Sequence, residues 1–227
     1  MNVVETKNVH KIYEGVESVH AVNGVDLSIE AGEFTAIVGP SGSGKTTFLN
    51  LIGGLDKPTS GEVLVGGLDM AGLNENQLTE FRLENIGFVF QAYNLIPVLT
   101  AQENVEFVML LQNQPKEQRE QRVTELMTAV GLADRMKNRP NQLSGGQQQR
   151  VAVARALAPK PRFVLADEPT ANLDSKSTAN LLDIMARLNQ EEGITFIFST
   201  HDQRVIDRAR RVITLEDGKI VSDEHRD

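Results

Sequence analysis

Phe34-Thr35-Ala36-Ile37-Val38 is followed without a break by Gly39-Pro40-Ser41-Gly42-Ser43-Gly44-Lys45-Thr46. The first five residues form a dense apolar run, which is typical of a β-strand buried on both faces. The next eight match the pattern GxxxxGK[ST], and the residues after them predict a helix over Lys45–Ile52. Strand, glycine-rich turn and helix in this order predict a loop whose backbone N–H groups surround phosphate oxygens.

Each part of this loop has a chemical role. The glycines let N–H groups turn inward, and the start of the helix adds a partial positive charge. Lys45 can reach the β- and γ-phosphates of a nucleotide, and the Thr46 hydroxyl can ligate Mg²⁺. A chance glycine-rich turn would not account for the strand and the helix on its two sides. The residues predicted to bind nucleotide here are Gly39, Pro40, Ser41, Gly42, Ser43, Gly44, Lys45 and Thr46.

Short β-rich runs alternate with helical patterns along the rest of the chain. Strands are predicted at 3–5, 18–29, 61–66, 163–166, 194–198 and, at an edge, 218–221. Helices are predicted at 103–111, 116–130, 146–157 and 175–188. Buried strands that alternate with helices predict an α/β fold with a parallel sheet covered on both faces.

Composition excludes several classes of protein. The 227 residues contain no cysteine, so disulfides and thiolate metal sites are excluded, and a metal must be held by oxygen or histidine. Lys and Arg total 23 against 31 Asp and Glu, and a net charge of -8 disfavours non-specific nucleic-acid binding. The longest uncharged stretch, 86–102, is too short and polar to span a bilayer. We expect a soluble protein whose membrane role, if any, requires a partner.

Two carboxylates follow the predicted strand at 163–166. Asp167 and Glu168 would lie at the tip of a parallel strand, where ligands bind in such sheets. Asp167 is the candidate to hold Mg²⁺ through a water, and Glu168 could accept a proton from an attacking water. Taken alone, the pair fits a solvated strand end equally well. Its combination with a phosphate loop favours the catalytic interpretation.

A second glycine cluster, Leu143-Ser144-Gly145-Gly146-Gln147, precedes a predicted helix. Ser144 is a good N-cap, and the two glycines expose backbone N–H groups, so a second anion site is predicted. Ser-Gly-Gly is also a common helix entry without any ligand.

With these motifs in this order, the chain resembles the nucleotide-binding subunits of ATP-binding-cassette (ABC) transporters. The resemblance covers about residues 3–221 and includes that family's LSGGQ signature without a change. It implies one ABC ATPase domain over 1–227, with a P-loop NTPase core and a mostly parallel core sheet. It also implies an N-terminal antiparallel β subdomain and a helical subdomain at roughly 92–158.

The resemblance assigns further roles by position. Tyr13 corresponds to an aromatic residue that stacks on adenine, although a partly exposed strand tyrosine is the simpler alternative. Gln91 corresponds to the glutamine that senses Mg²⁺ and the γ-phosphate, His201 to the switch histidine, and Asp174 to an aspartate that communicates between two sites. The nucleotide-binding set also includes Thr47, Ser144, Gly145, Gly146 and Gln147.

In the resembling family the phosphate loop and the signature loop that hold one γ-phosphate come from different subunits. The resemblance therefore implies a homodimer that holds two ATP molecules with Mg²⁺ and separates after hydrolysis to ADP and phosphate. It also implies a separate integral membrane permease as partner. That places the protein in the cytoplasm, at the inner face of the cell membrane. No nucleic-acid partner is expected.

Apolar residues crowd just after Gln91, and the resemblance implies that they receive a helix of the permease. They are Tyr93, Leu95, Ile96, Val98 and Leu99. Ordinary core packing is the alternative for any one of them. A charge at Leu95 or Leu99 is expected to uncouple transport and to spare basal ATP hydrolysis.

The run IGFVFQAYNLIPVLTAQENV (86–105) most resembles the subfamily that serves lipoprotein release and macrolide-type export. Export or extraction of lipoprotein or lipid is therefore the expected process. The alternative is an ABC ATPase outside transport, in DNA repair or translation. The long coiled-coil insertions of repair members and the tandem cassettes of translation members are not seen in this sequence. A small-molecule kinase would share only the phosphate loop.

Overall fold

The computed structural model describes residues 1–15 and 18–226. The strands are β1 (Asn2–Tyr13), β2 (Val19–Glu30), β3 (Phe34–Val38), β4 (Ser60–Val65), β5 (Leu68–Asp69), β6 (Ile86–Val89), β7 (Phe163–Asp167), β8 (Thr195–Ser199), β9 (Arg211–Glu216) and β10 (Lys219–His225). The helices are α1 (Lys45–Ile52), α2 (Glu75–Asn85), α3 (Ala101–Leu111), α4 (Lys116–Ala129), α5 (Gly145–Leu157), α6 (Ser175–Glu192) and α7 (Gln203–Ile206). Short 3-10 turns lie at Ala133–Arg135 and Pro140–Gln142.

The strands form two sheets. The larger sheet has the order β10-β9-β3-β8-β7-β6, in which β10 alone is antiparallel to its neighbour. The smaller sheet, β2-β1-β4-β5, is antiparallel throughout. The predicted α/β class, with a mostly parallel core sheet and an N-terminal antiparallel region, is confirmed.

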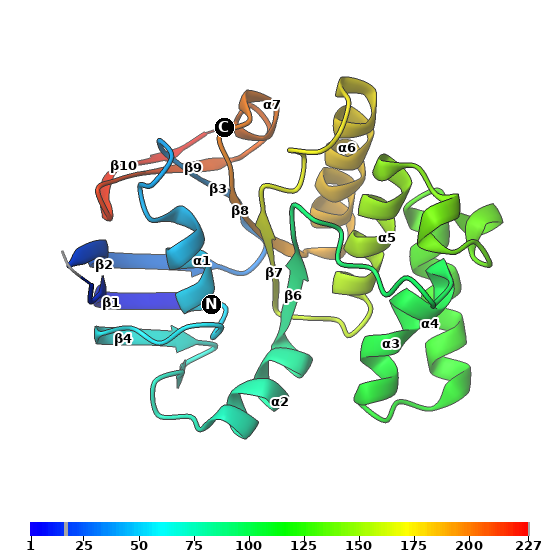
Figure 1. The fold of residues 1–227 in the computed structure, drawn as a ribbon, viewed down its shortest axis with the longest axis horizontal. Helices are drawn as coiled ribbons and strands as arrows, with labels where there is room; N and C mark the ends of the chain where they lie inside the picture. The colour runs from blue at the N-terminus through cyan, green and yellow to red at the C-terminus, as the bar shows by residue number, and fades with distance from the viewer. Residues whose placement is uncertain (16–17, 227) are drawn as a thin grey trace.

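Helix α1 lies between the two sheets, as Figure 1 shows. Its buried residues share one core with the antiparallel strands and with Phe163 and Leu165 of β7. The alternate residues of β7, Val164 and Ala166, face a second core built with α3, α4, α5 and α6. Because side chains alternate across a strand, β7 is apolar on both faces and contributes to both cores.

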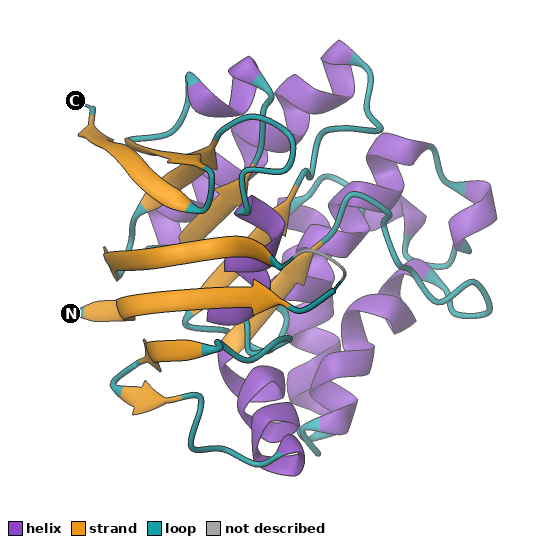
Figure 2. Ribbon diagram, turned by 60° about the vertical axis from the view of Figure 1, so that its left-hand side comes forward, coloured by secondary structure: helices purple, strands orange, loops and turns teal. Residues whose placement is uncertain are grey.

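Helices α3, α4 and α5 gather on the side of the molecule away from the antiparallel sheet (Figures 1 and 2). They pack on one another, and α5 also contacts β6 and α6. These helices fall within the range predicted for a helical subdomain. The division of the chain at residues 92 and 158 stays a prediction.

Candidate functional site

The carboxyl ends of four adjacent parallel strands meet at one edge of the larger sheet. β3 leads into the phosphate loop, β6 toward Gln91, β7 into Glu168 and β8 into His201. Ligands of open parallel sheets bind outside such strand ends. A pocket of about 980 Å³ opens there. Its lining consists of Val19, His20, Ala21, Asn23, Gly39, Pro40, Ser41, Gly42, Gly44, Lys45, Thr46, Thr47, Gln91, Glu168, His201 and Asp217.

The phosphate loop requires glycine at two positions for steric reasons. Gly39 and Gly44 have φ angles of 148° and 98°, and a Cβ on either would lie 2.0 Å from a backbone oxygen, that of Leu215 or Ala21. α1 begins at Lys45, behind a glycine that supplies no side-chain cap. The loop therefore directs the first N–H groups of the helix, with their positive dipole, toward the pocket.

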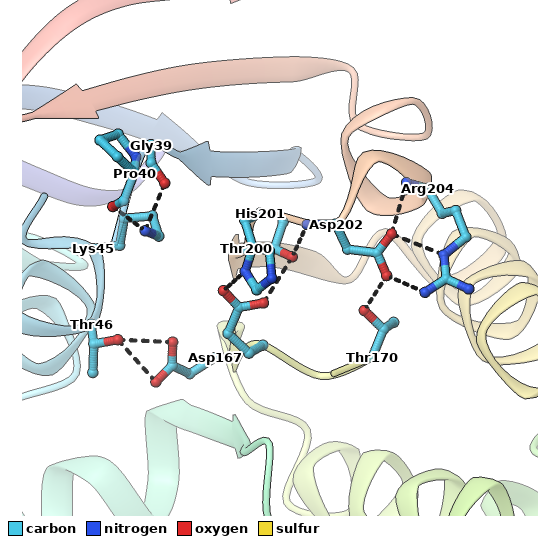
Figure 3. A network of polar contacts seen from close by, with 11 residues as sticks. Gly39, Pro40, Lys45, Thr46, Asp167, Thr170, Thr200, His201, Asp202 and Arg204 are labelled. Carbon is cyan, nitrogen blue, oxygen red and sulfur yellow. Dashed lines mark hydrogen bonds and ion pairs between the residues drawn. The ribbon is translucent and has the colours of Figure 1, made fainter. Parts of the chain in front are cut away.

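Lys45 is held across the phosphate loop. Its side chain is mostly buried, and Nζ donates hydrogen bonds to the carbonyl oxygens of Gly39 (2.9 Å) and Pro40 (3.0 Å), as drawn in Figure 3. These neutral carbonyl acceptors hold the ammonium group within the loop, where negatively charged phosphate oxygens could replace them. Ser43 is the one member of the predicted loop that lies buried beneath it and not in the pocket lining.

Thr46 and Asp167 form a pair of oxygen donors beside the pocket. The Thr46 hydroxyl lies 3.2 and 3.3 Å from the two carboxylate oxygens of Asp167 (Figure 3). A hydroxyl and a carboxylate fit Mg²⁺, which takes few protein ligands and completes its shell with water and phosphate oxygens. Within the described ranges, no group of three or more His, Asp or Glu side chains is placed to hold a metal ion.

Glu168 is fixed in an unusual backbone conformation. Its φ of 45° is left-handed, and its backbone N–H donates to Ser199 at 2.9 Å. One carboxylate oxygen lies 2.6 Å from Nδ1 of His201, and the other accepts from the Thr200 hydroxyl at 3.2 Å. β7 and β8 therefore bring the predicted base and the predicted switch histidine into direct contact. A non-glycine residue at positive φ costs free energy and is concentrated at functional sites.

A second carboxylate supports this arrangement from behind. The backbone N–H of Asp202 donates to the Thr200 hydroxyl, and its carboxylate accepts from Thr170 (2.7 Å) and from Arg204 (Figure 3). The Arg204 hydrogen bonds, together with that of Thr170, lower the pKa of Asp202 to about 2 against the opposing effect of burial. Asp202 is therefore ionised at neutral pH and links the β7 and β8 ends.

Gln91 lines the same pocket as the phosphate loop. Its side chain is exposed, and its backbone oxygen accepts from the Asn172 side chain at 3.1 Å. Gln91 thus shares one pocket with Lys45, Thr46 and Glu168, and its role as a sensor of Mg²⁺ and the γ-phosphate stays a prediction.

Tyr13 lies at the end of β1, outside the pocket lining. Its ring is 43% exposed, with the Lys11 ammonium 5.0 Å from the ring centroid. Its hydroxyl donates to Asp56 at 2.9 Å. The pKa of the Tyr13 hydroxyl is raised, mainly by partial burial and to a smaller extent by this contact with Asp56. The ring remains accessible from one side, and its adenine-stacking role stays a prediction.

The signature residues lie away from this pocket. Ser144 caps α5 by accepting from the backbone N–H of Gln147, whose side chain accepts from the Ser144 N–H. Asp174 caps α6 and accepts from the N–H and hydroxyl of Ser177. Of the predicted nucleotide-binding residues, those outside the pocket are therefore Tyr13, Ser43, Ser144, Gly145, Gly146, Gln147 and Asp174.

Several site residues were not predicted from the sequence. Val19, His20, Ala21, Asn23 and Asp217 line the pocket because the β1–β2 and β9–β10 hairpins fold over the phosphate loop. These residues match no motif, and only the fold brings them there. Thr170 and Asp202 could have been predicted, because both are polar residues that follow closely after Glu168 and His201 in the sequence.

The apolar strip predicted after Gln91 is only partly exposed. Val98 is 71% exposed, whereas Leu95 packs against the helical core, so a charge at Leu95 would disturb folding first. A groove of about 640 Å³ lies beside this strip, between α2, β6, α3 and α5. Its lining consists of Leu55, Thr79, Arg82, Leu83, Ile86, Gly87, Phe88, Phe90, Asn94, Val108, Leu111, Arg155, Ala156 and Pro159.

Among the described residues, no helix has the length and apolar character needed to cross a bilayer.

Comparison with known proteins identifies the family to which this chain belongs. The family model described as "ABC transporter" matches residues 22–171, and a model described as "AAA domain, putative AbiEii toxin, Type IV TA system" matches 139–207. An uncharacterized ABC transporter ATP-binding protein of Thermotoga maritima is 47% identical over 99% of this chain and 96% of its own length. The macrolide export ATP-binding/permease protein MacB of Aggregatibacter actinomycetemcomitans is 45% identical, over 100% of this chain and 35% of its own length.

A solved structure agrees with the fold. The ATP-binding cassette MJ0796 of Methanocaldococcus jannaschii, in a dimeric post-hydrolysis state bound to ADP and Pi, superposes with a TM-score of 0.89. It is 47% identical, and the match covers 98% of both chains.

Proposed function

Because this chain belongs to the ABC transporter family and is an ATPase, we propose that two copies of it enclose ATP and drive a separate membrane permease. The observation that carries the proposal is the distribution of the motifs. The phosphate loop, Gln91, Glu168 and His201 share one pocket, whereas the signature residues lie outside it. A second copy can supply the missing signature loop.

Within one chain, the proposed hydrolytic roles follow from the contacts. Lys45 and the loop N–H groups bind the β- and γ-phosphates, and Glu168 accepts the proton of the attacking water. His201 holds the Glu168 carboxylate through the 2.6 Å contact, and Gln91 lines the same pocket. Mg²⁺, held by Thr46 and Asp167 with Gln91 nearby, would neutralise charge on the phosphates.

The second copy supplies the rest of the site. In the proposed dimer, Ser144, Gly145, Gly146 and Gln147 of each chain meet the γ-phosphate held by the other, and Asp174 lies between the two sites. The dimeric MJ0796 cassette supports this arrangement, since the two chains superpose closely. Loss of the γ-phosphate on hydrolysis would remove the bridge and let the copies separate.

The permease partner is inferred from a groove and from relatives. The groove is lined largely by apolar residues, and its walls include Phe90, next to Gln91. A helix seated there would contact the segment that reports on the γ-phosphate. MacB is named as an ATP-binding/permease protein, and this chain matches 35% of its length. We propose that this chain acts together with a membrane permease at the cytoplasmic face of the membrane.

Export, or extraction of lipoprotein or lipid, is the proposed process. The relatives named for macrolide and pyoverdine export support it. The alternative in DNA repair or translation is not favoured, because these relatives are transport proteins and this chain carries a net charge of -8.

Two neighbouring leucines of α3 test the permease groove. Leu110 and Leu111 are each 51% exposed, but only Leu111 lines the groove. Leu111→Glu would place a charge in an apolar interface, so we expect membranes of the source organism to stimulate its ATP hydrolysis about tenfold less than that of the wild type. Rates are measured with and without membranes.

Leu110→Glu is the matched control and is expected to respond to membranes as the wild type does. Equal loss of stimulation in both variants would contradict the groove assignment. Stimulation of the wild type by DNA or ribosomes, and not by membranes, would contradict the transport function itself.

A further inference from the structure

Gln149 has a buried side-chain amide close to the proposed catalytic residues. None of the roles assigned above uses this amide. It lies on α5, five residues after Ser144, and is 0% exposed. Its Nε2 donates to the backbone oxygen of Pro169 at 2.7 Å and to that of Phe90 at 3.2 Å. An amide nitrogen carries two hydrogens, so one side chain satisfies both buried carbonyls.

These two carbonyls flank the proposed catalytic residues. Phe90 immediately precedes Gln91, and Pro169 immediately follows Glu168. β6 and β7 are neighbours in the sheet, so Gln149 bridges the loops that leave two adjacent strands. A shift of α5 would therefore be transmitted through this amide to both loops at once.

Other side chains hold the same loop to α5. Arg155, two turns further along the helix, donates to the backbone oxygens of Tyr93 (3.1 Å) and Asn94. At the start of the helix, a Cβ on Gly145 would lie only 2.6 Å from the Tyr93 hydroxyl, so the signature loop packs closely on the same loop. The segment from Phe90 to Asn94 is thus anchored to α5 at both of its ends.

The second polar atom of Gln149 is not satisfied. Within the part of the chain that the structure describes, its Oε1 is buried and has no hydrogen-bond partner. An unpaired buried acceptor lowers stability, and a methionine of similar volume at this position would have no such acceptor. Local choices that reduce stability are concentrated at functional sites.

From these contacts we propose that Gln149 is a positioning residue that couples the signature helix α5 to Gln91 and Glu168. When the partner's ATP engages the signature loop of one chain, α5 of that chain is held in place. Through Gln149 its own Gln91 and Glu168 are then aligned at its own nucleotide. The inference rests on the proposed two-copy ATPase and adds a route between its two sites.

The test compares two buried amides. Gln149→Met keeps the volume and removes the donors, and we expect kcat for ATP to fall about 10- to 100-fold with the Kd for ATP changed less than about twofold. Asn189→Leu is the control, since Asn189 also donates to backbone carbonyls, those of Gly32, Glu33 and Ile194, but far from the pocket lining. It is expected to lower thermal stability and to leave kcat within about twofold.

Hydrogen exchange separates positioning from general loss of structure. In Gln149→Met, amide exchange should accelerate in peptides covering 88–94 and 168–174, while peptides of β1 and β2 stay as in the wild type. Gln149→Asn, which keeps the amide one methylene shorter, is the second variant if Met does not fold, and its kcat should also fall.

Wild-type kcat in a folded Gln149 variant would overturn the proposal. The proposal would also be overturned if Gln149→Met and Asn189→Leu, at equal loss of stability, showed the same losses of kcat and of ATP affinity. A wild-type protein without ATPase activity would instead overturn the proposed function.

Discussion

At the scale of single residues, the site depends on how Glu168 is held. Its left-handed backbone, its N–H bond to Ser199 and the contacts of its carboxylate with Thr200 and His201 fix both ends of the residue. A flexible glutamate would sample many rotamers, and only a few would face an attacking water. Pre-orientation of this kind lowers the entropic part of the barrier.

Glu168→Gln keeps the shape of the side chain and removes its basicity. We expect turnover of ATP to fall on the order of 10²–10⁴-fold, with nucleotide affinity retained. Steady-state hydrolysis and equilibrium binding of a fluorescent ATP analogue measure the two quantities. Unchanged turnover would reject Glu168 as the base.

Asp202 gives a pH-dependent prediction. Its pKa of about 2 in the folded protein is below the usual 3.8, so its ionised form stabilises the fold above about pH 4 and the contribution is lost as the pH falls toward 2. Because Asp202 is partly exposed, Asp202→Asn should lower the free energy of unfolding at pH 7 by only about 1 kcal/mol.

Urea unfolding of Asp202→Asn and the wild type at pH 7 and at pH 3 checks this sign. The two stabilities should approach each other at the lower pH. A gap that widens as the pH falls would show that the Asp202 contacts do not stabilise the charged form.

At the scale of helices and strands, the pattern of apolar residues determined which elements could be predicted from the sequence. α1 was predicted with the bounds that the structure has, and β3, β7 and β8 to within one residue, because each is a dense apolar run or follows a motif. β1 and β10, predicted as short strands, continue to Tyr13 and His225. The outer residues of β10 are polar, and in β1 the apolar residues Val9 and Ile12 are separated by polar ones, so neither extension forms a dense apolar run.

Five elements were not predicted, namely α2, β5, β6, α7 and β9, and three of these misses have identifiable reasons. α2 buries a single residue, Leu78, so it has no apolar stripe. β6 is only four residues long and opens an uncharged stretch. β9 begins with the charged Arg211, which is buried because Glu33 and Asp223 pair with it, a tertiary contact that no local pattern reveals.

The contact between α5 and the loop after Gln91 gives a prediction at this scale. In Gly145→Ala the new Cβ would lie 2.6 Å from the Tyr93 hydroxyl, at the end of a side chain that can shift, so we expect a loss of up to about 1 kcal/mol in stability. Tyr93→Phe removes that oxygen and leaves the next ring atom at 3.5 Å. The double variant should recover part of the loss in a double-mutant cycle measured by urea unfolding. Strictly additive effects would place Gly145 and Tyr93 further apart.

At the scale of the whole molecule, the motifs predicted which residues belong to the site, and the fold determines where those residues lie relative to one another. The phosphate loop was predicted from its motif, Asp167 and Glu168 from their place after a predicted strand, and Gln91 from the resemblance to a known family. That Ser144 and Asp174 lie outside the pocket is a property of the folded chain. The hairpin residues around the loop and the bridging role of Gln149 likewise depend on tertiary contacts.

The central claim is that ATP joins two copies of this chain. The most direct measurement is the mass of Glu168→Gln by sedimentation at saturating Mg-ATP, with Mg-ADP as the reference. We expect twice the chain mass with ATP and the mass of a single chain with ADP. A single chain at saturating ATP would contradict it.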